Sequence, residues 1–167
     1  MEQLTHYNTT FENKQFPITV ICDEVYFQDN IGSIFRICDA MGVSKIIFSG
    51  EDFIFSERKI NKTSRSTHKH LPFEILKSKE ALIQYIQKSE AQVVAIEITA
   101  TSQPLNTLQL IPNQPLLLII GNEIHGISDE ILTIVPTHAH IPMFGKNSSM
   151  NVVQSLAIAL YEITNTL

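Results

Sequence analysis

Three stretches of this 167-residue sequence combine glycine with side chains that are able to do chemistry. Residues 30–36 (NIGSIFR), called the Asn-Arg motif below, carry an amide and a guanidinium. Residues 121–128 (GNEIHGIS), the Gly-Glu loop, place a carboxylate between two glycines. Residues 141–151 (IPMFGKNSSMN), the Pro-Met loop, offer hydroxyl and amide groups beside an apolar tripeptide. Glycine lets a ligand or another backbone approach closely, so each stretch is a candidate binding site.

Each stretch alone also fits a plain structural role. Asn30 could cap a helix, Glu123 could be a solvated side chain in a tight turn, and Ser149 or Asn151 could cap the last helix. The Gly-Glu loop lacks both the glycine spacing of a dinucleotide fingerprint and the lysine of a P-loop. We therefore do not expect it to hold a pyrophosphate.

The elements that must position these side chains alternate between strand and helix. Residues 115–120 (PLLLII) are apolar on both faces, as expected for a central parallel strand. Other short apolar or β-branched runs predict strands at residues 18–22, 45–49, 73–76, 92–98 and 139–143.

Helices are predicted between these strands from capping residues and from apolar residues at helical spacing. Asp29 or Asn30 would begin a helix that ends before Gly42, and Ser78 would cap another through residue 88. Ser128 would cap a short helix through residue 135. The remaining predictions are a short helix from residue 56, a helical turn at 105–108, and a last helix from about residue 150.

Alternating strands and helices indicate an α/β fold with a mostly parallel sheet flanked by helices. The length suits a single domain, residues 1–167, in which residues 1–16 are expected to be a loosely ordered N-terminal segment. Such sheets bind ligands outside the carboxyl ends of their strands. The chemistry should therefore lie in the loops that follow Cys22, Ser49, Ile98, Ile120 and Met143.

The composition, 44% hydrophobic and 17% charged, is that of a globular protein. Cys22 and Cys38 are too few for a disulfide framework, so we expect the reducing cytoplasm. No apolar run approaches the ~18 residues of a membrane span, and the polar N-terminus is not typical of a signal peptide. His138 and His140 share a face of a predicted strand, but no third ligand is evident, so we expect structural histidines and no metal.

The net charge of −5 argues against general attraction to nucleic acid, but the basic residues are unevenly distributed. Residues 58–70, called the basic segment below, contain five lysines and arginines, and the only acid beside them is Glu57. Charge alone leaves two interpretations open, a solvated loop or a surface that faces nucleic acid. The five cations are Arg58, Lys59, Lys62, Arg65 and Lys69.

Together and in this order, the three stretches resemble the signature motifs of the SpoU branch of the SPOUT RNA methyltransferases. The pattern N-x-G-x-x-x-R is met by Asn30, Gly32 and Arg36. The pattern G-x-E-x-x-G-x-S is met by Gly121, Glu123, Gly126 and Ser128. The pattern I-P-M-x-G-x-x-x-S-x-N is met by Ile141, Pro142, Met143, Gly145, Ser149 and Asn151. Many members carry leucine where this chain has Met150, and the resemblance covers about residues 17–165.

The resemblance implies a C-terminal trefoil knot, a homodimer, and S-adenosylmethionine as the cofactor in the loops of the knot. The implied reaction transfers a methyl group to a ribose 2′-hydroxyl of RNA and needs no metal. Cofactor contacts are implied for Gly121, Ile141, Met143 and Met150, with a residue near Ile96 at the end of an earlier strand. Catalytic roles are implied for Arg36, Asn30, Glu123, Ser149 and Asn151.

In this family the arginine is proposed to help remove the proton of the hydroxyl. Because a guanidinium is effectively always protonated, we expect Arg36 mainly to hold a phosphate and to stabilise the developing alkoxide. Asn30 would orient the ribose or Arg36, and Glu123 would fix the Gly-Glu loop or Arg36. Ser149 and Asn151 would order the cofactor loop. The basic segment follows the strand beside the Asn-Arg motif, so the resemblance favours an RNA-facing surface there.

Two other interpretations stay open. One is a catalytically inactive, RNA-binding module of the same fold. The other is a flavodoxin-like nucleotide-binding domain, although residues 23–30 have neither glycine nor Ser/Thr to make its phosphate loop. Transfer RNA is expected rather than ribosomal RNA, because the chain is short and shows no added RNA-binding domain. The sequence does not indicate which nucleotide is methylated.

Overall fold

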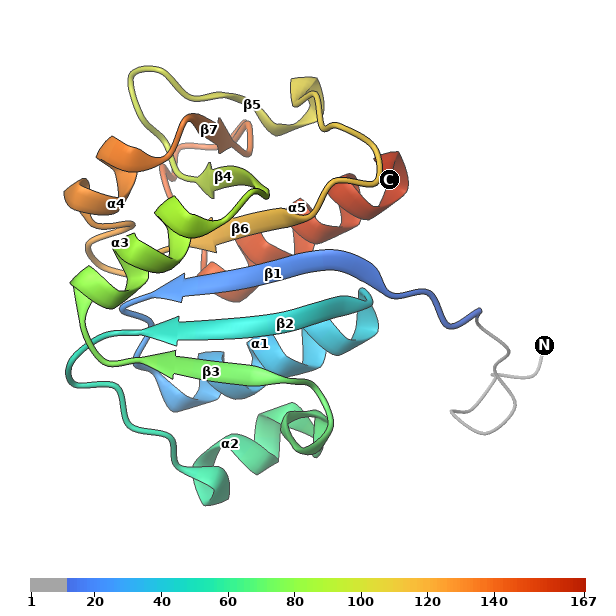
Figure 1. The fold of residues 1–167 in the computed structure, drawn as a ribbon, viewed down its shortest axis with the longest axis vertical. Helices are drawn as coiled ribbons and strands as arrows, with labels where there is room; N and C mark the ends of the chain where they lie inside the picture. The colour runs from blue at the N-terminus through green and yellow to red at the C-terminus, as the bar shows by residue number, and fades with distance from the viewer. Residues whose placement is uncertain (1–11) are drawn as a thin grey trace.

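The computed structural model describes residues 12–167, which form a three-layer α/β fold (Figure 1). Seven strands of this part of the chain make one sheet in the order β3-β2-β1-β6-β4-β7-β5, and all its strand pairs are parallel. The predicted α/β class with a mostly parallel sheet is confirmed. The prediction that residues 1–16 form a loosely ordered segment lies largely outside the described residues, which begin at residue 12.

The strands follow the predicted apolar runs closely. Every residue of β6 is buried, and β6 lies at the centre of the sheet between β1 and β4, as the apolar run predicts. The two-residue strand β5 is not predicted from the sequence. The bounds are β1 Phe16–Asp23, β2 Val43–Ser49, β3 Phe73–Leu76, β4 Gln92–Ile96, β5 Gln103–Pro104, β6 Leu116–Ile120 and β7 Thr137–His140.

Two strand ends differ from the prediction. β4 ends at Ile96, two residues early, because the Glu97 side chain bonds the backbone N–H of Ile98 (2.9 Å) and turns the chain. β7 spans residues 137–140 rather than 139–143. Pro142 has no N–H to give to a β ladder, so the strand stops before it. Both shifts lengthen the loops at the carboxyl edge of the sheet.

The helices begin and end close to the predicted residues. Ser78 caps α3 by accepting from the N–H of Ala81 at 3.1 Å. The predicted cap of α1 is wrong, because Phe27 occupies that position and both Asp29 and Asn30 lie inside the first turn. The bounds are α1 Gln28–Ala40, α2 Glu57–Ser64, α3 Lys79–Lys88, α4 Asp129–Ile134 and α5 Val152–Thr166, with 3₁₀ turns at η1 Thr67–Lys69 and η2 Leu105–Thr107.

Helices cover both faces of the sheet. Figure 1 shows α1 and α5 on one side of the strands and α3 and α4 on the other. Successive residues of β6 alternate between the two apolar cores, so that Leu118 contributes to the α1/α5 side and Ile119 to the α3/α4 side. Because every strand runs the same way, the carboxyl ends of β1, β4, β6 and β7 meet at one edge. The three motifs lie in the segments that leave this edge.

Helix α1 is held tightly between its neighbours, since it contacts both α2 and α5. A side chain at Gly32 would bring its Cβ within 2.0 Å of the Thr63 hydroxyl oxygen and 2.6 Å of the Ile60 carbonyl. Gly32 therefore lets α2, and with it the basic segment, lie directly against α1. No helix within residues 12–167 combines the length and the apolar character needed to cross a bilayer.

Candidate active site

A cavity of about 330 Å³ lies at the carboxyl edge of the sheet. Its walls come from the ends of β4, β6 and β7 and from the start of α5, so both the Gly-Glu loop and the Pro-Met loop contribute. This volume is at the lower end of the range typical of small-molecule sites. All five residues predicted to contact a cofactor line it: Ile96, Gly121, Ile141, Met143 and Met150.

The Gly-Glu loop is a tight turn built around Asn122. The backbone groups of Asn122 and Gly126 exchange two hydrogen bonds of 2.9 Å, and the Asn122 side-chain oxygen accepts from the N–H groups of Ile124 and His125. A Cβ on Gly121 would lie 2.2 Å from both the carbonyl carbon of Gly126 and the backbone nitrogen of Ile127. Glycine is therefore required at residue 121 for the two ends of the turn to meet.

Glu97 locks this turn from the neighbouring loop. Its carboxylate accepts from the N–H of Ile127 at 3.1 Å and also lines the cavity. Gly126 has φ +71°, and a Cβ there would lie 2.5 Å from the Glu97 carboxylate. The sequence prediction missed Glu97 because it placed this residue inside the strand. Glu97 could have been found from the sequence, because it is an acidic residue near the end of a predicted parallel strand, where ligands bind in such sheets.

A buried carboxylate, Asp23, anchors the other end of the Gly-Glu loop. Asp23 is 1% exposed, and one of its oxygens accepts from both the N–H (2.9 Å) and the hydroxyl (2.7 Å) of Ser128. The other oxygen accepts from the Ser49 hydroxyl at 3.2 Å. Ser128 stands at the start of α4 as predicted, but its hydroxyl bonds Asp23 instead of capping the helix. Asp23 thus ties β1, β2 and α4 together.

The three motifs are joined by side-chain hydrogen bonds around Asn30. The Asn30 amide donates to one carboxylate oxygen of Glu123, and its oxygen accepts from the Asn151 amide at 3.3 Å. The Asn151 oxygen in turn accepts from the N–H of Val153 at 2.9 Å and caps α5. Because an ionised carboxylate only accepts, Asn30 presents its NH₂ to Glu123, and this orientation fixes that of Asn151.

Glu123 keeps one unused acceptor. Its second carboxylate oxygen is buried and has no hydrogen-bond partner among the described residues. Glu123 and Ser149 also line the cavity. A buried carboxylate oxygen without a donor is unfavourable, so this position suits a ligand or side chain that brings a donor or a positive charge.

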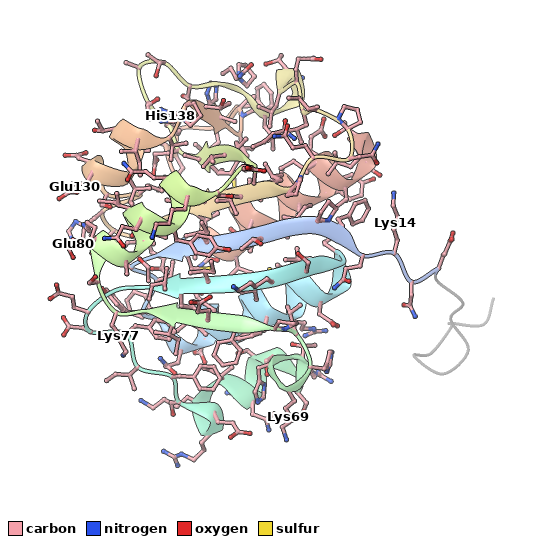
Figure 2. All side chains as sticks on the ribbon, viewed as in Figure 1. Lys14, Lys69, Lys77, Glu80, Glu130 and His138 are labelled. Atoms are coloured by element: carbon pink, nitrogen blue, oxygen red, sulfur yellow. The ribbon has the colours of Figure 1, made fainter. Side chains whose placement is uncertain are left out.

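Arg36 is not part of this network. It lies on α1 two turns beyond Asn30, is exposed, and makes no hydrogen bond or ion pair within the described chain. The five cations of the basic segment are likewise exposed and unpaired within residues 12–167. Figure 2 labels Lys69 near α2, at the β3 end of the molecule, and His138 at the opposite end. The residues predicted to contact the cofactor and the predicted RNA-binding cations therefore lie in separate regions of the structure, and α1 connects the two regions.

The two histidines of β7 each have local partners. The His138 Nε2–H donates to the Leu132 carbonyl at 3.1 Å, and its Nδ1 accepts from the Thr99 hydroxyl at 3.1 Å. His140 Nδ1 lies 2.9 Å from the hydroxyl oxygen of Ser102, which itself donates to the Thr99 carbonyl. The pair fastens the segment between β4 and β5 to β7, as structural histidines do.

Cys22 is the residue before the last of β1, beneath the site, but it is not a nucleophile. Burial raises the pKa of the Cys22 thiol well above its ordinary value, and the nearby Cys38, Glu123 and Asp23 raise it further. A neutral, buried thiol is inert. The side chains available for chemistry along the cavity are therefore the hydroxyls of Ser148, Ser149 and Ser155, the amide of Asn122, the carboxylates of Glu97 and Glu123, and the imidazoles of His125 and His140.

Known proteins share this fold and sequence pattern. The model of a family described as the SpoU rRNA Methylase family matches residues 17–161. The tRNA (guanosine(18)-2′-O)-methyltransferase of Aquifex aeolicus is 28% identical over 162 residues, which are 96% of this chain and 75% of that relative. The 23S rRNA (adenosine(1067)-2′-O)-methyltransferase of Streptomyces azureus is 32% identical over 145 residues, 86% of this chain and 52% of that relative.

Among solved structures, the AdoMet-bound rRNA methyltransferase from Sinorhizobium meliloti superposes with a TM-score of 0.84. It is 27% identical and covers 94% of this chain, while this chain covers 59% of it. The chain thus spans three quarters of the Aquifex relative but only about half to three fifths of the other two.

Proposed function

Because the chain belongs to the SpoU rRNA methylase family, we propose that it transfers a methyl group from S-adenosylmethionine to a ribose 2′-hydroxyl of RNA. The observation that carries this proposal is the hydrogen-bonded chain Glu123–Asn30–Asn151 at the cavity. It joins residues of all three motifs at the place where five expected cofactor residues meet. Both relatives are named as 2′-O-methyltransferases, so the inactive alternative is not favoured.

The cavity fits the proposed cofactor in its chemistry. Ile96, Ile141 and Met143 offer apolar surface to a flat base, while the tight turn at Gly121 brings backbone groups to the wall. Glu97 and the unused oxygen of Glu123 suit positively charged and hydroxyl groups. When bound, the cofactor would supply a methyl group already activated on a sulfonium. The protein would then mainly align the acceptor hydroxyl and exclude water.

Asn30 and Arg36 would prepare the ribose hydroxyl. Asn30 is fixed by Glu123 and Asn151, so its position beside the cavity is set before any ligand arrives. Arg36 lies on the same helix and has no partner among residues 12–167, and a phosphate is the natural partner of such a guanidinium. A phosphate held by Arg36 would bring the adjoining ribose toward Asn30, and the guanidinium would stabilise the developing oxyanion.

The RNA would lie along α1. This helix carries Asn30 at the cavity, Arg36 two turns on, and α2 with the basic segment against its side. The cations of the basic segment, which have no ion pair among the described residues, would give a phosphate-binding path that continues away from the site. The named relatives act on transfer RNA and on ribosomal RNA. We favour transfer RNA, as expected from the sequence.

Assembly and location follow the resemblance. We propose a homodimer, supported by the exposed apolar side chains Ile158 and Tyr161 on α5. We also propose the trefoil knot: β7 lies between β4 and β5, so the segment joining those two strands passes around a later part of the chain. The buried free thiols Cys22 and Cys38 suit the reducing cytoplasm.

The activity is tested with S-adenosylmethionine labelled in its methyl group and, separately, total transfer RNA and ribosomal RNA. A 2′-O-methyl group blocks attack on the neighbouring phosphate, so label in alkali-resistant dinucleotides identifies ribose methylation. Absence of label from both RNA pools would contradict the proposal. Mass spectrometry of the labelled fragments then identifies the nucleotide.

The role of Arg36 is tested by Arg36→Ala. We expect a loss of methyl transfer of at least about 100-fold, with cofactor binding within about 2-fold of the wild type. Lys88→Ala is the matched control, since Lys88 is an exposed cation at the end of α3 on the other face of the sheet. Near-normal transfer by Arg36→Ala would refute the assignment.

A further inference from the structure

Two unusually exposed apolar side chains belong to the two loops that line the cavity. Phe144 is 98% exposed and Ile124 is 74% exposed, which are the highest values among the large hydrophobic residues of the described chain. They come from different loops, since Ile124 belongs to the Gly-Glu loop and Phe144 to the Pro-Met loop. Ile124 lines the cavity itself, and Phe144 directly follows Met143, which also lines it.

The surroundings of both residues argue against a packing role. The backbone of Ile124 is held in place, because its N–H donates to the Asn122 side chain at 2.8 Å. The Ile124 side chain nevertheless does not pack against the core. Beside Phe144, a Cβ built on Gly145 would meet nothing within 4 Å, so that side of the loop is open space. An aromatic ring held in solvent next to a binding cavity is a ready contact surface.

The charge beside Phe144 indicates the kind of partner. Lys146 follows two residues later, is exposed, and has no ion pair within the described chain. An aromatic face next to a free cation is the combination that binds single-stranded nucleic acid, where a base stacks on the ring and the cation meets a phosphate. Stacking needs no particular base, since every base has a flat face.

We propose that Phe144 is the stacking platform for the base of the target nucleotide, and that Lys146 holds a neighbouring phosphate. Ile124 forms the apolar edge of the same mouth. This inference rests on the proposed function, because it needs an RNA whose ribose enters the cavity. A base stacked on Phe144 would leave its ribose beside the cavity mouth, with the cofactor behind it.

The sequence supplies a direct probe, because the chain contains no tryptophan. Phe144→Trp keeps an aromatic face and adds a single fluorophore at the proposed platform. We expect a single-stranded 12-mer RNA to quench its fluorescence, and an abasic 12-mer of the same backbone to leave it unchanged. Ile111→Trp is the matched control, because Ile111 is 60% exposed in the loop before β6, at the other edge of the sheet.

The energetic test compares Phe144→Ala with Phe144→Tyr. We expect Phe144→Ala to weaken binding of the 12-mer by about 10- to 100-fold and Phe144→Tyr to bind within about 3-fold of the wild type. Binding of S-adenosylhomocysteine should stay within about 2-fold for both. Lys146→Ala should weaken RNA binding and lower its dependence on salt.

Three results would overturn the proposal. Unchanged RNA affinity in Phe144→Ala would show that no base stacks on Phe144. An equal loss of cofactor affinity would assign Phe144 to the cofactor, and a change in molar mass by light scattering would assign it to contact with a second copy. In each case wild-type methyl transfer to RNA would still stand, whereas its absence would refute the proposed function instead.

Discussion

The buried carboxylate of Asp23 offers the sharpest test of how the site is held together. Replacing it with alanine removes the acceptor of three hydrogen bonds, two from Ser128 and one from Ser49. The Ser49 and Ser128 hydroxyls can rotate toward other acceptors, but the backbone N–H of Ser128 cannot. Hydrogen bonds to a charged group contribute about 1.5–3 kcal/mol each, and those sharing one partner are not additive. We therefore expect Asp23→Ala to lower the free energy of unfolding by about 3 kcal/mol.

Asp23→Asn separates hydrogen bonding from charge. Its side-chain oxygen can still accept from Ser128, and its NH₂ can donate to the Ser49 hydroxyl, so all three positions keep partners. We expect a loss of only about 1 kcal/mol, from the weaker neutral hydrogen bonds at Ser128. Urea unfolding followed by circular dichroism measures both values. Ser128→Ala and the double variant complete a mutant cycle, which should give a coupling above about 1 kcal/mol.

The same variants report on the Gly-Glu loop. Asp23 holds Ser128, which closes the Gly-Glu loop, so Asp23→Ala should also weaken cofactor binding measured by calorimetry. The reasoning is refuted if Asp23→Ala and Asp23→Asn destabilise equally, because the loss would then come from charge and not from unpaired donors. A loss below about 1 kcal/mol in Asp23→Ala would also refute it.

Three further predictions concern the loop, the RNA surface and the thiols. Gly126→Ala, at φ +71° and facing the Glu97 carboxylate, should cost about 1–3 kcal/mol in urea unfolding and weaken cofactor binding, whereas Gly145→Ala, in open space, should change stability by less than about 0.5 kcal/mol. Equal effects of the two would contradict the close contact. A second variant reverses the charge at Lys59, Lys62 and Arg65. It should weaken RNA binding and reduce the slope of log affinity against log salt by about 0.7 per lost phosphate contact, with cofactor affinity unchanged; an unchanged slope would return the basic segment to a solvated surface. Because burial raises the pKa of both Cys22 and Cys38, neither thiol should react with a disulfide reagent at pH 8 until urea unfolds the chain, and rapid labelling of the native protein would disprove this.

The order and type of the strands and helices can be predicted well from the sequence, because each element is determined largely by residues that are close together in the chain. The apolar run of β6, the Ser78 cap of α3 and the Gly42 that follows α1 each depend on a few neighbouring residues. Strand ends are harder, because they depend on what a side chain meets in space. The β-branched residues around Glu97 predict that it belongs to a strand. In the structure its carboxylate instead accepts hydrogen bonds from the N–H groups of Ile98 and Ile127.

The candidate site divides in the same way. The motif residues are recognisable from their spacing, and six of them line one cavity: Gly121, Glu123, Gly126, Ile141, Met143 and Ser149. Asp23 and Asn122 cannot be recognised from the sequence in this way, because their hydrogen-bond partners lie far along the chain. Asp23 accepts from Ser128, and the Asn122 amide donates to the Glu24 carbonyl. Asn30 shows the limit most clearly. Its local pattern predicts a helix cap, but Glu123 and Asn151 use its side chain instead.

The hydrogen bonds of Asn30 also determine when the pocket can form during synthesis of the chain. Asn30 lies 93 residues before Glu123 and 121 residues before Asn151. At about 5–20 residues per second, its last partner is made some 6–24 seconds after Asn30 itself. An incomplete chain on the ribosome therefore lacks a finished pocket, however well its first strands have folded. Cofactor capture, which would stabilise only the finished pocket, then requires that residues 30–151 have been made and have folded together.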